Sequence, residues 1–257
     1  MSTKEGATVV NLNRMKHACR ECSLRELCLP VGLNDTDIHS LEKMIKRRQT
    51  LKKGDFLYRV GDPLSALYAV SSGSIKTSEL AHDGDIQITG FHLPGELLGI
   101  DAISTDLHPC DAVALETTVV CELPMNKLEA LAREIPSLQR QLLRVLSREI
   151  VQDENLLMML GKMNAEARLA ACLVSFSERF ERLGHSGTKF KLSMSRQDMG
   201  DYLGLALETV SRLFSRFQEE GLIRVEGRHI QLLNLAGLRA LTGKGGAGQG
   251  SRHQPVA

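Results

Sequence analysis

The chain has no tryptophan, and aromatic residues make up only 4% of its 257 residues. It contains no apolar run near the roughly 18 to 20 residues that cross a bilayer. The first 16 residues also lack the apolar segment of a secretory signal. These absences argue against a membrane-spanning or secreted protein, so we expect a cytoplasmic protein without a membrane partner.

The chain also lacks an excess of charge of either sign, since its formal net charge is +1. A nucleic-acid partner would therefore require locally concentrated positive charge. Familiar catalytic motifs are missing as well. There is no G-x-S-x-G, no Walker loop, no H-E-x-x-H and no Gly-rich dinucleotide fingerprint. We therefore favour a binding protein over an enzyme and predict no catalytic residues.

Six cysteines are present, and three of them lie close together in the spacing C-x2-C-x5-C: Cys19, Cys22 and Cys28. In a reducing cytosol such a group indicates metal ligation or redox chemistry rather than a disulfide framework. The spacing alone leaves two kinds of centre open. Both a structural zinc site and an iron–sulfur cluster use four thiolates.

The remaining sequence divides into segments of different character. We predict a leader with the cysteine loop at 1–33, a β-barrel sensor domain at 34–133, a dimerisation helix at 134–163, a DNA-binding domain at 164–241 and a disordered tail at 242–257. Short apolar runs between turn glycines indicate the barrel, and Asp83-Gly84 marks its clearest hairpin turn. Asn34 or Asp35 can cap a short helix before it.

The predicted dimerisation helix carries a repeating seam with spacing 3-4-3-4-3, as in a coiled coil. Its members are Leu143, Leu146, Ile150, Asp153, Leu157 and Leu160. In a parallel homodimer Asp153 would face its twin, which would weaken the seam. The alternative is a helix that packs only on its own β-domain.

Residues 193–217 have the pattern helix, tight turn, helix, with Ser195 as a cap and Gly204 in the turn. On the second helix Glu208, Ser211 and Arg212 share one face, Thr209 adjoins them and Arg216 continues the face toward phosphate. These side-chain types can read base edges in a major groove. An ordinary solvated face is the alternative. A β-hairpin with a Glu-Gly turn follows at 221–232, and this wing favours a winged helix-turn-helix.

The order of these segments resembles the CRP/FNR superfamily of bacterial transcription regulators, and more closely its oxygen-responsive FNR/ANR branch. The resemblance covers about Ala18 to Leu241. Its motifs are Cys19-x2-Cys22-x5-Cys28, Gln87-Ile88-Thr89-Gly90-Phe91-His92-Leu93, Ala114-Leu115-Glu116-Thr117, Val120-Cys121-Glu122-Leu123-Pro124, Tyr202-Leu203-Gly204-Leu205 and Glu208-Thr209-Val210-Ser211-Arg212. The implied fold is α+β, with a jelly-roll-like β-barrel, a long dimerisation helix and a C-terminal winged helix-turn-helix.

The resemblance implies a [4Fe-4S] cluster held by Cys19, Cys22, Cys28 and one distant cysteine. Cys110 and Cys121 both fall in the region where the family has its fourth ligand. We assign Cys121, because it lies in the run that leads to the dimerisation helix, and we interpret Cys110 as a loop thiol. A zinc-stabilised or thiol-redox-responsive regulator of the same fold is the alternative.

The resemblance also implies a homodimer that binds palindromic promoter DNA with TTGAT-like half-sites when oxygen is low. It implies contacts with RNA polymerase, which we place at barrel loops such as His82 to Asp85. The superfamily's other branch binds a cyclic nucleotide through an Arg-Ser pair. Here Cys110-Asp111 takes the place of that pair, and Asp111 would repel a phosphate, so we expect no cyclic nucleotide.

Overall fold

The computed structural model describes residues 19, 22–45, 48–80 and 84–243. The predicted leader up to residue 18, the tail from residue 244 and Asp83 of the hairpin turn lie outside the described residues. The helices are α1 (Asp35–Met44), the 3-10 helix η3 (Ile100–Ser104), α2 (Met125–Glu134), α3 (Pro136–Lys162), α4 (Ala165–Arg182), α5 (Arg196–Leu203), α6 (Leu207–Glu219) and α7 (Leu235–Leu241). Within this part of the chain no helix is both long and apolar enough to span a membrane.

The β-domain is built from two four-stranded antiparallel sheets, as the glycine-punctuated sequence predicts. One sheet has the order β1-β8-β3-β6 and the other β2-β7-β4-β5. Their strands are β1 (Arg48–Leu51), β2 (Phe56–Tyr58), β3 (Ala66–Ser72), β4 (Ile75–Leu80), β5 (Ile86–His92), β6 (Leu97–Leu98), β7 (Asp111–Ala114) and β8 (Thr118–Pro124). Gly73 shows why glycine is needed at one turn. Its φ is +81°, and a Cβ there would lie 2.5 Å from the hydroxyl of Thr118.

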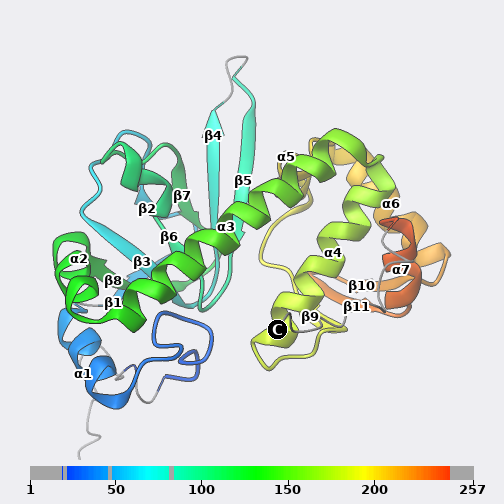
Figure 1. Cartoon of the computed structure of the whole chain (residues 1–257). Helices are drawn as coiled ribbons and strands as arrows, with labels where there is room; N and C mark the ends of the chain where they lie inside the picture. The colour runs from blue at the N-terminus through cyan, green and yellow to red at the C-terminus, as the bar shows by residue number, and fades with distance from the viewer. Residues whose placement is uncertain (1–18, 20–21, 46–47, 81–83, 244–257) are drawn as a thin grey trace, which may run out of the picture.

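The long helix α3 crosses from the β-domain to the C-terminal unit and links the two (Figure 1). Pro136 occupies its first turn, where a missing N–H costs nothing. One face of α3 is buried, with Leu138, Gln141, Val145 and Met159. At the N-terminal side, the Asn34 side chain caps α1 by accepting a hydrogen bond from the amide of Asp37 at 2.8 Å.

The C-terminal unit surrounds a three-stranded sheet of order β10-β11-β9 with helices α4 to α7. Strands β10 (Ile223–Glu226) and β11 (His229–Leu232) form the predicted wing, and β9 (Lys189–Lys191) pairs with β11. Gly227 in the wing turn has φ +62°. The predicted α+β class, with a barrel, a long helix and a winged helix-turn-helix, is confirmed. The exact division into five segments stays a prediction.

The two units share one apolar core rather than being joined by the helix alone. Ile88, Phe91 and Leu93 of the β-domain belong to the same cluster of buried residues as Phe176 of α4 and Met199 of α5. This arrangement fixes where the winged helix-turn-helix lies relative to the barrel.

Candidate metal centre and nucleic-acid interface

The cysteine loop, here residues 19 and 22–33, is folded by a succession of tight turns. The amide of Cys22 donates to the carbonyl of Cys19 at 3.3 Å, and the amide of Cys28 donates to the carbonyl of Leu24 at 2.9 Å. Leu29 is buried and anchors the loop in the apolar cluster beneath α1 and α2. The loop is therefore held by its own backbone and by apolar anchors that include Leu29 and Leu33.

Cys121 lies on β8, the strand between β1 and β3, where it is paired with Arg48 on one side and Ala69 on the other. Cys19, Cys28 and Cys121 pack against the same apolar cluster and are all half-buried. Burial, together with the charges of Cys121, Glu42 and Cys22, raises the pKa of Cys19 to about 12. Cys28 also has its pKa raised to about 12, by burial first and by Cys121, Cys19 and Cys22 in addition.

The pKa shifts of Cys19 and Cys28 both include a contribution from Cys121, so thiols from two distant segments of the sequence lie close enough to interact. Burial also raises the pKa of Cys121, which the Arg48 guanidinium lowers and Cys22 raises. The charge of Cys22 is thus a common cause of the raised pKa of Cys19, Cys28 and Cys121. Within the described residues, however, no three Cys, His, Asp or Glu side chains are gathered closely enough to hold a metal ion.

Cys110 occupies a different place, inside the barrel. It is buried, and its thiol donates to the carboxylate of Asp101 at 3.3 Å. Its neighbours include Tyr58, whose ring stacks on His108 with centroids 3.7 Å apart. Burial raises the pKa of Cys110, and the nearby carboxylate of Asp101 raises it further. Cys110 thus lies in a different apolar cluster from Cys19, Cys28 and Cys121.

The donor set suits an iron–sulfur cluster. Iron–sulfur clusters are held by four cysteine thiolates, and three of the four candidate thiols, Cys19, Cys28 and Cys121, pack against one apolar cluster. The residues present therefore fit the group, although four thiolates also suit zinc.

The exposed face of α3 carries the predicted seam. Leu143, Ile150 and Leu157 are 59%, 58% and 70% exposed in the single chain. Asp153 is exposed among them, whereas Leu146 and Leu160 are half-buried. Large apolar side chains left open along one helix face indicate a surface that another protein covers.

The helix-turn-helix consists of α5, a turn at Gly204 and α6. Ser195 and Asp198 form a capping box, in which the Asp198 amide donates to the Ser195 hydroxyl at 3.0 Å and the Ser195 amide donates to Asp198 at 2.8 Å. Gly204 has φ +62°. Gly200 permits the tight turn, since a Cβ there would lie 2.5 Å from the carbonyl of Leu205.

The candidate base-reading residues point away from the core of this unit. Glu208, Ser211 and Arg212 are exposed, while Val210, Phe214 and Phe217 on the other face are buried. Arg212 donates to the hydroxyl of Thr209 at 3.3 Å, which orients its guanidinium. The base-reading roles stay predictions, and the geometry supports them.

Arg216 has a different environment from the one we expected. It donates to Glu220 at 2.7 Å and forms an ion pair with Glu166 of α4 at 3.2 Å. A guanidinium with two carboxylate partners is less available to a phosphate. The phosphate contact stays a prediction, and the ion pairs suggest that Arg216 also fastens α6 to α4.

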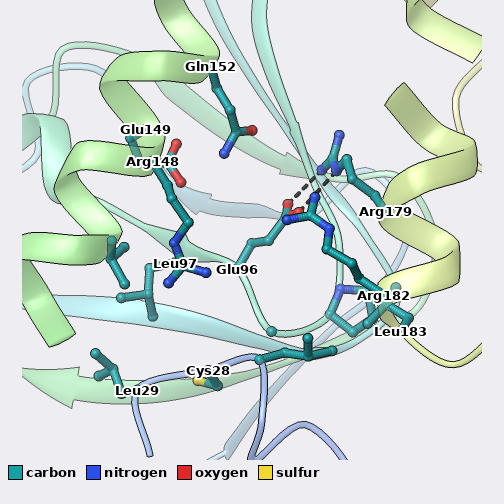
Figure 2. Close-up of a pocket in the computed structure, with 14 residues that line it drawn as sticks. Cys28, Leu29, Glu96, Leu97, Arg148, Glu149, Gln152, Arg179, Arg182 and Leu183 are labelled. Atoms are coloured by element: carbon teal, nitrogen blue, oxygen red, sulfur yellow. Dashed lines mark hydrogen bonds and ion pairs between the residues drawn. The ribbon is translucent and has the colours of Figure 1, made fainter. Parts of the chain in front are cut away.

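Two polar contacts near the cysteine loop were not predicted from the sequence. Gln141 on α3 is only 2% exposed, and its side-chain amide donates to the carbonyl of Cys28 at 3.4 Å. Arg179 of α4 forms a two-pronged ion pair with Glu96 of the barrel (Figure 2). The only available signal was the placement of Gln141 between the apolar residues Leu138 and Val145 on a buried helix face.

Comparisons with known proteins agree with this architecture. Residues 48–134 match a family described as cyclic nucleotide-binding domain, and residues 167–241 match one described as Crp-like helix-turn-helix domain. The chain is 50% identical to the transcriptional activator protein Anr of Pseudomonas protegens, over 88% of this chain and 92% of that protein. It is 45% identical to the fumarate and nitrate reduction regulatory protein of Salmonella typhimurium, over 88% and 90%. Among solved structures, FixK2 from Bradyrhizobium japonicum superposes with a TM-score of 0.70 at 32% identity, covering 76% of this chain and 96% of that one.

With the fold, the recognition helix and these relatives together, the chain belongs to the CRP/FNR family of transcription regulators. It is a DNA-binding regulator and not an enzyme. Within the family it is of the FNR/Anr type, as the resemblance of its cysteine and recognition-helix motifs implies.

Proposed function

We propose that this protein is a cytoplasmic, oxygen-sensing global transcription regulator. At low oxygen it holds a [4Fe-4S] cluster, forms a homodimer and binds palindromic promoter sites with TTGAT-like half-sites, activating or repressing genes of anaerobic metabolism. The observation that carries the proposal is that Cys19 and Cys28 of the cysteine loop pack against the same apolar cluster as Cys121 of β8. The name of a relative from Haemophilus influenzae, anaerobic regulatory protein, supports the physiological part.

When bound, the cluster supplies an oxygen-labile link between the cysteine loop and β8. The chain's own residues carry the consequence to α3. While the loop is fixed, the carbonyl of Cys28 accepts the hydrogen bond from Gln141. Release of the loop breaks this hydrogen bond and lets water reach the Gln141 amide, at a net cost of about 0.5–1.5 kcal/mol. That cost falls on the helix that carries the seam, so loop position and dimerisation are coupled.

Three side chains in the barrel argue against a cyclic nucleotide as the effector. The Asp111 carboxylate accepts a hydrogen bond from the amide of Val60 at 2.8 Å, and Cys110 is bonded to Asp101. Glu96, in the Gly-Glu-Leu motif, is paired with Arg179. All three side chains already have hydrogen-bond or ion-pair partners within the protein. The carboxylates of Asp111 and Glu96 would also repel a phosphate.

For RNA polymerase we propose contact through the hairpin of β4 and β5, which projects from the barrel (Figure 1). Leu80 and Ile86 flank its tip and are 74% and 52% exposed. Apolar side chains at such a projecting tip are suited to a protein partner.

Metal analysis tests the proposed cofactor. Protein purified without oxygen should contain about four iron and about four sulfide per chain and should be brown, because four thiolates support a cubane cluster. Iron, zinc and acid-labile sulfide are to be measured on the same sample. A colourless protein with one zinc per chain would contradict the sensor and support the zinc-stabilised regulator instead.

Arg212→Ala tests base reading by α6. The exposed guanidinium can pair with guanine in two hydrogen bonds, so its loss should cost about 1–3 kcal/mol at one base pair. Dissociation constants for a set of half-sites altered one base pair at a time give this number, with Ser215→Ala on the same helix as control. If Arg212→Ala weakens binding to every sequence equally, the residue contacts phosphate rather than a base.

A further inference from the structure

Glu96 of the barrel and Arg179 of the DNA-binding unit form one of the ion pairs that join the two units. The carboxylate oxygens of Glu96, at the turn before β6, accept hydrogen bonds from Nε and Nη2 of Arg179 at 3.0 and 2.6 Å. Arg179 also donates to the carbonyl of Phe91 at the end of β5. The side chains of Arg179 and Glu96 are 11% and 23% exposed. A two-pronged pair at this depth is specific in geometry as well as charge.

The electrostatics of the pair agree with its geometry. Burial by itself would raise the pKa of Glu96, but Arg179 outweighs that effect and holds this pKa below its usual value. Burial likewise opposes the charge of Arg179, and the neighbouring Glu96 restores it. Each group therefore stabilises the charge of the other, and removing either leaves a poorly solvated charge.

A second group of contacts holds the start of α5 to β4. The ammonium of Lys76 pairs with Asp198 at 2.6 Å, and the hydroxyl of Ser74 donates to that of Ser193 at 2.6 Å. Asp198 is also half of the capping box of α5. In this docked arrangement Glu208, Ser211 and Arg212 remain exposed. Docking therefore leaves the DNA-reading face open.

The cysteine loop packs on the turn that carries Glu96. Gly95 has φ +89°, and a Cβ built there would lie 3.1 Å from the Cβ of Leu27. Leu27 and Cys28 line the same cavity as Glu96 and Arg179, between the loop, α3 and α4 (Figure 2). Leu27 of the loop therefore contacts Gly95, the residue next to Glu96 of the ion pair.

We propose that Glu96 and Arg179 are positioning residues, a latch that holds the winged helix-turn-helix in its DNA-binding orientation, and that the cysteine loop controls this latch through the Gly95–Glu96 turn. This route lies within one chain and differs from the dimer seam. Control by the loop rests on the proposed function, whereas the latch itself does not.

A double-mutant cycle tests the latch. Glu96→Gln and Arg179→Met keep the length of each side chain and remove its charge. Each should weaken DNA binding by about tenfold, and the double variant should lose about as much as one single variant, because both changes break the same contact. Hydrogen exchange of the β5 amides in the metal-free protein is the second measurement. It should quicken in all three variants, since β5 loses its cover.

Glu178→Gln is the matched control. Glu178 precedes Arg179 on α4 and pairs with Arg239 of α7 at 3.2 Å, but both side chains are about half exposed and lie in the same unit. This variant should leave DNA binding and β5 exchange unchanged. If the loss of DNA affinity in the double variant equals the product of the two single losses, the latch is overturned. Unchanged hydrogen exchange of the β5 amides in the single variants would also overturn it.

Control by the loop is tested in the full-length variant Ile150→Glu, which removes the seam by placing a charge on it. Cluster assembly should still slow β5 exchange in this monomer by about tenfold. Slowing that occurs only in the dimeric wild type would show that the loop acts through the seam and would overturn this part. A protein that binds no iron or sulfide would overturn both the proposed sensor and control by the loop, and the metal-free cycle would still decide the latch.

Discussion

Cys121→Ala should leave the protein unable to retain an iron–sulfur cluster and therefore unable to bind its promoter sites at low oxygen. Cys121 is the candidate ligand that lies in the barrel sheet, on a strand flanked by β1 and β3. The other three candidates lie in the cysteine loop. Without Cys121 the loop has three thiolates and no covalent path to β8. Iron and sulfide per chain should fall from about four each to near zero.

Cys110→Ala is the matched control, because it also removes one barrel thiol. Cys110 donates a hydrogen bond to Asp101 and lies in a different apolar cluster from Cys19, Cys28 and Cys121. The variant should keep its iron, its sulfide and its DNA affinity. Cluster loss in Cys110→Ala together with retention in Cys121→Ala would exchange the roles that we assign.

The helical part of the fold could be predicted because its signals are local. Ser195 caps α5, Gly200 closely approaches Leu205 and Gly204 has a positive φ, so the helix-turn-helix is encoded by local requirements. Likewise Pro136 marks the start of α3 and the 3-4 spacing marks its exposed face. The wing turn at Gly227 is a further local signal.

The contacts that couple the parts could not be predicted, because they join residues far apart in the chain. Glu96 and Arg179 are separated by 83 positions, and Gln141 lies 113 positions from Cys28. No periodicity records such pairs. The same reason explains Arg216, whose partner Glu166 lies on another helix. Distance in sequence also left Cys110 and Cys121 as rivals, and only the folded barrel separates their surroundings.

Asp153→Ala should keep the protein dimeric in air. Asp153 is exposed on α3, within the apolar seam that includes Ile150 and Leu157. In a parallel dimer the two carboxylates would face each other, and juxtaposed like charges oppose association by on the order of 1–3 kcal/mol. Removing them should lower the dimer dissociation constant by about tenfold to a hundredfold. Sedimentation in air measures this change.

Glu154→Ala is the matched control for that experiment, because it removes an exposed carboxylate one position away and off the seam. It should remain monomeric in air. Asp153→Ala remaining monomeric would show that the seam is not limited by this charge.

A pH titration of the wild type provides an independent check on the same repulsion. Partial burial and the charge of Asp101 on η3 already raise the pKa of Asp153 in the single chain. Association would raise it again, so the protonated form favours the dimer. Nearby Glu149 on α3 has a pKa raised to about 7 by burial and by the charges of Glu96 and Asp153. Dimerisation in air should therefore strengthen as the pH falls through the pKa of Asp153, and Asp153→Ala should flatten that dependence.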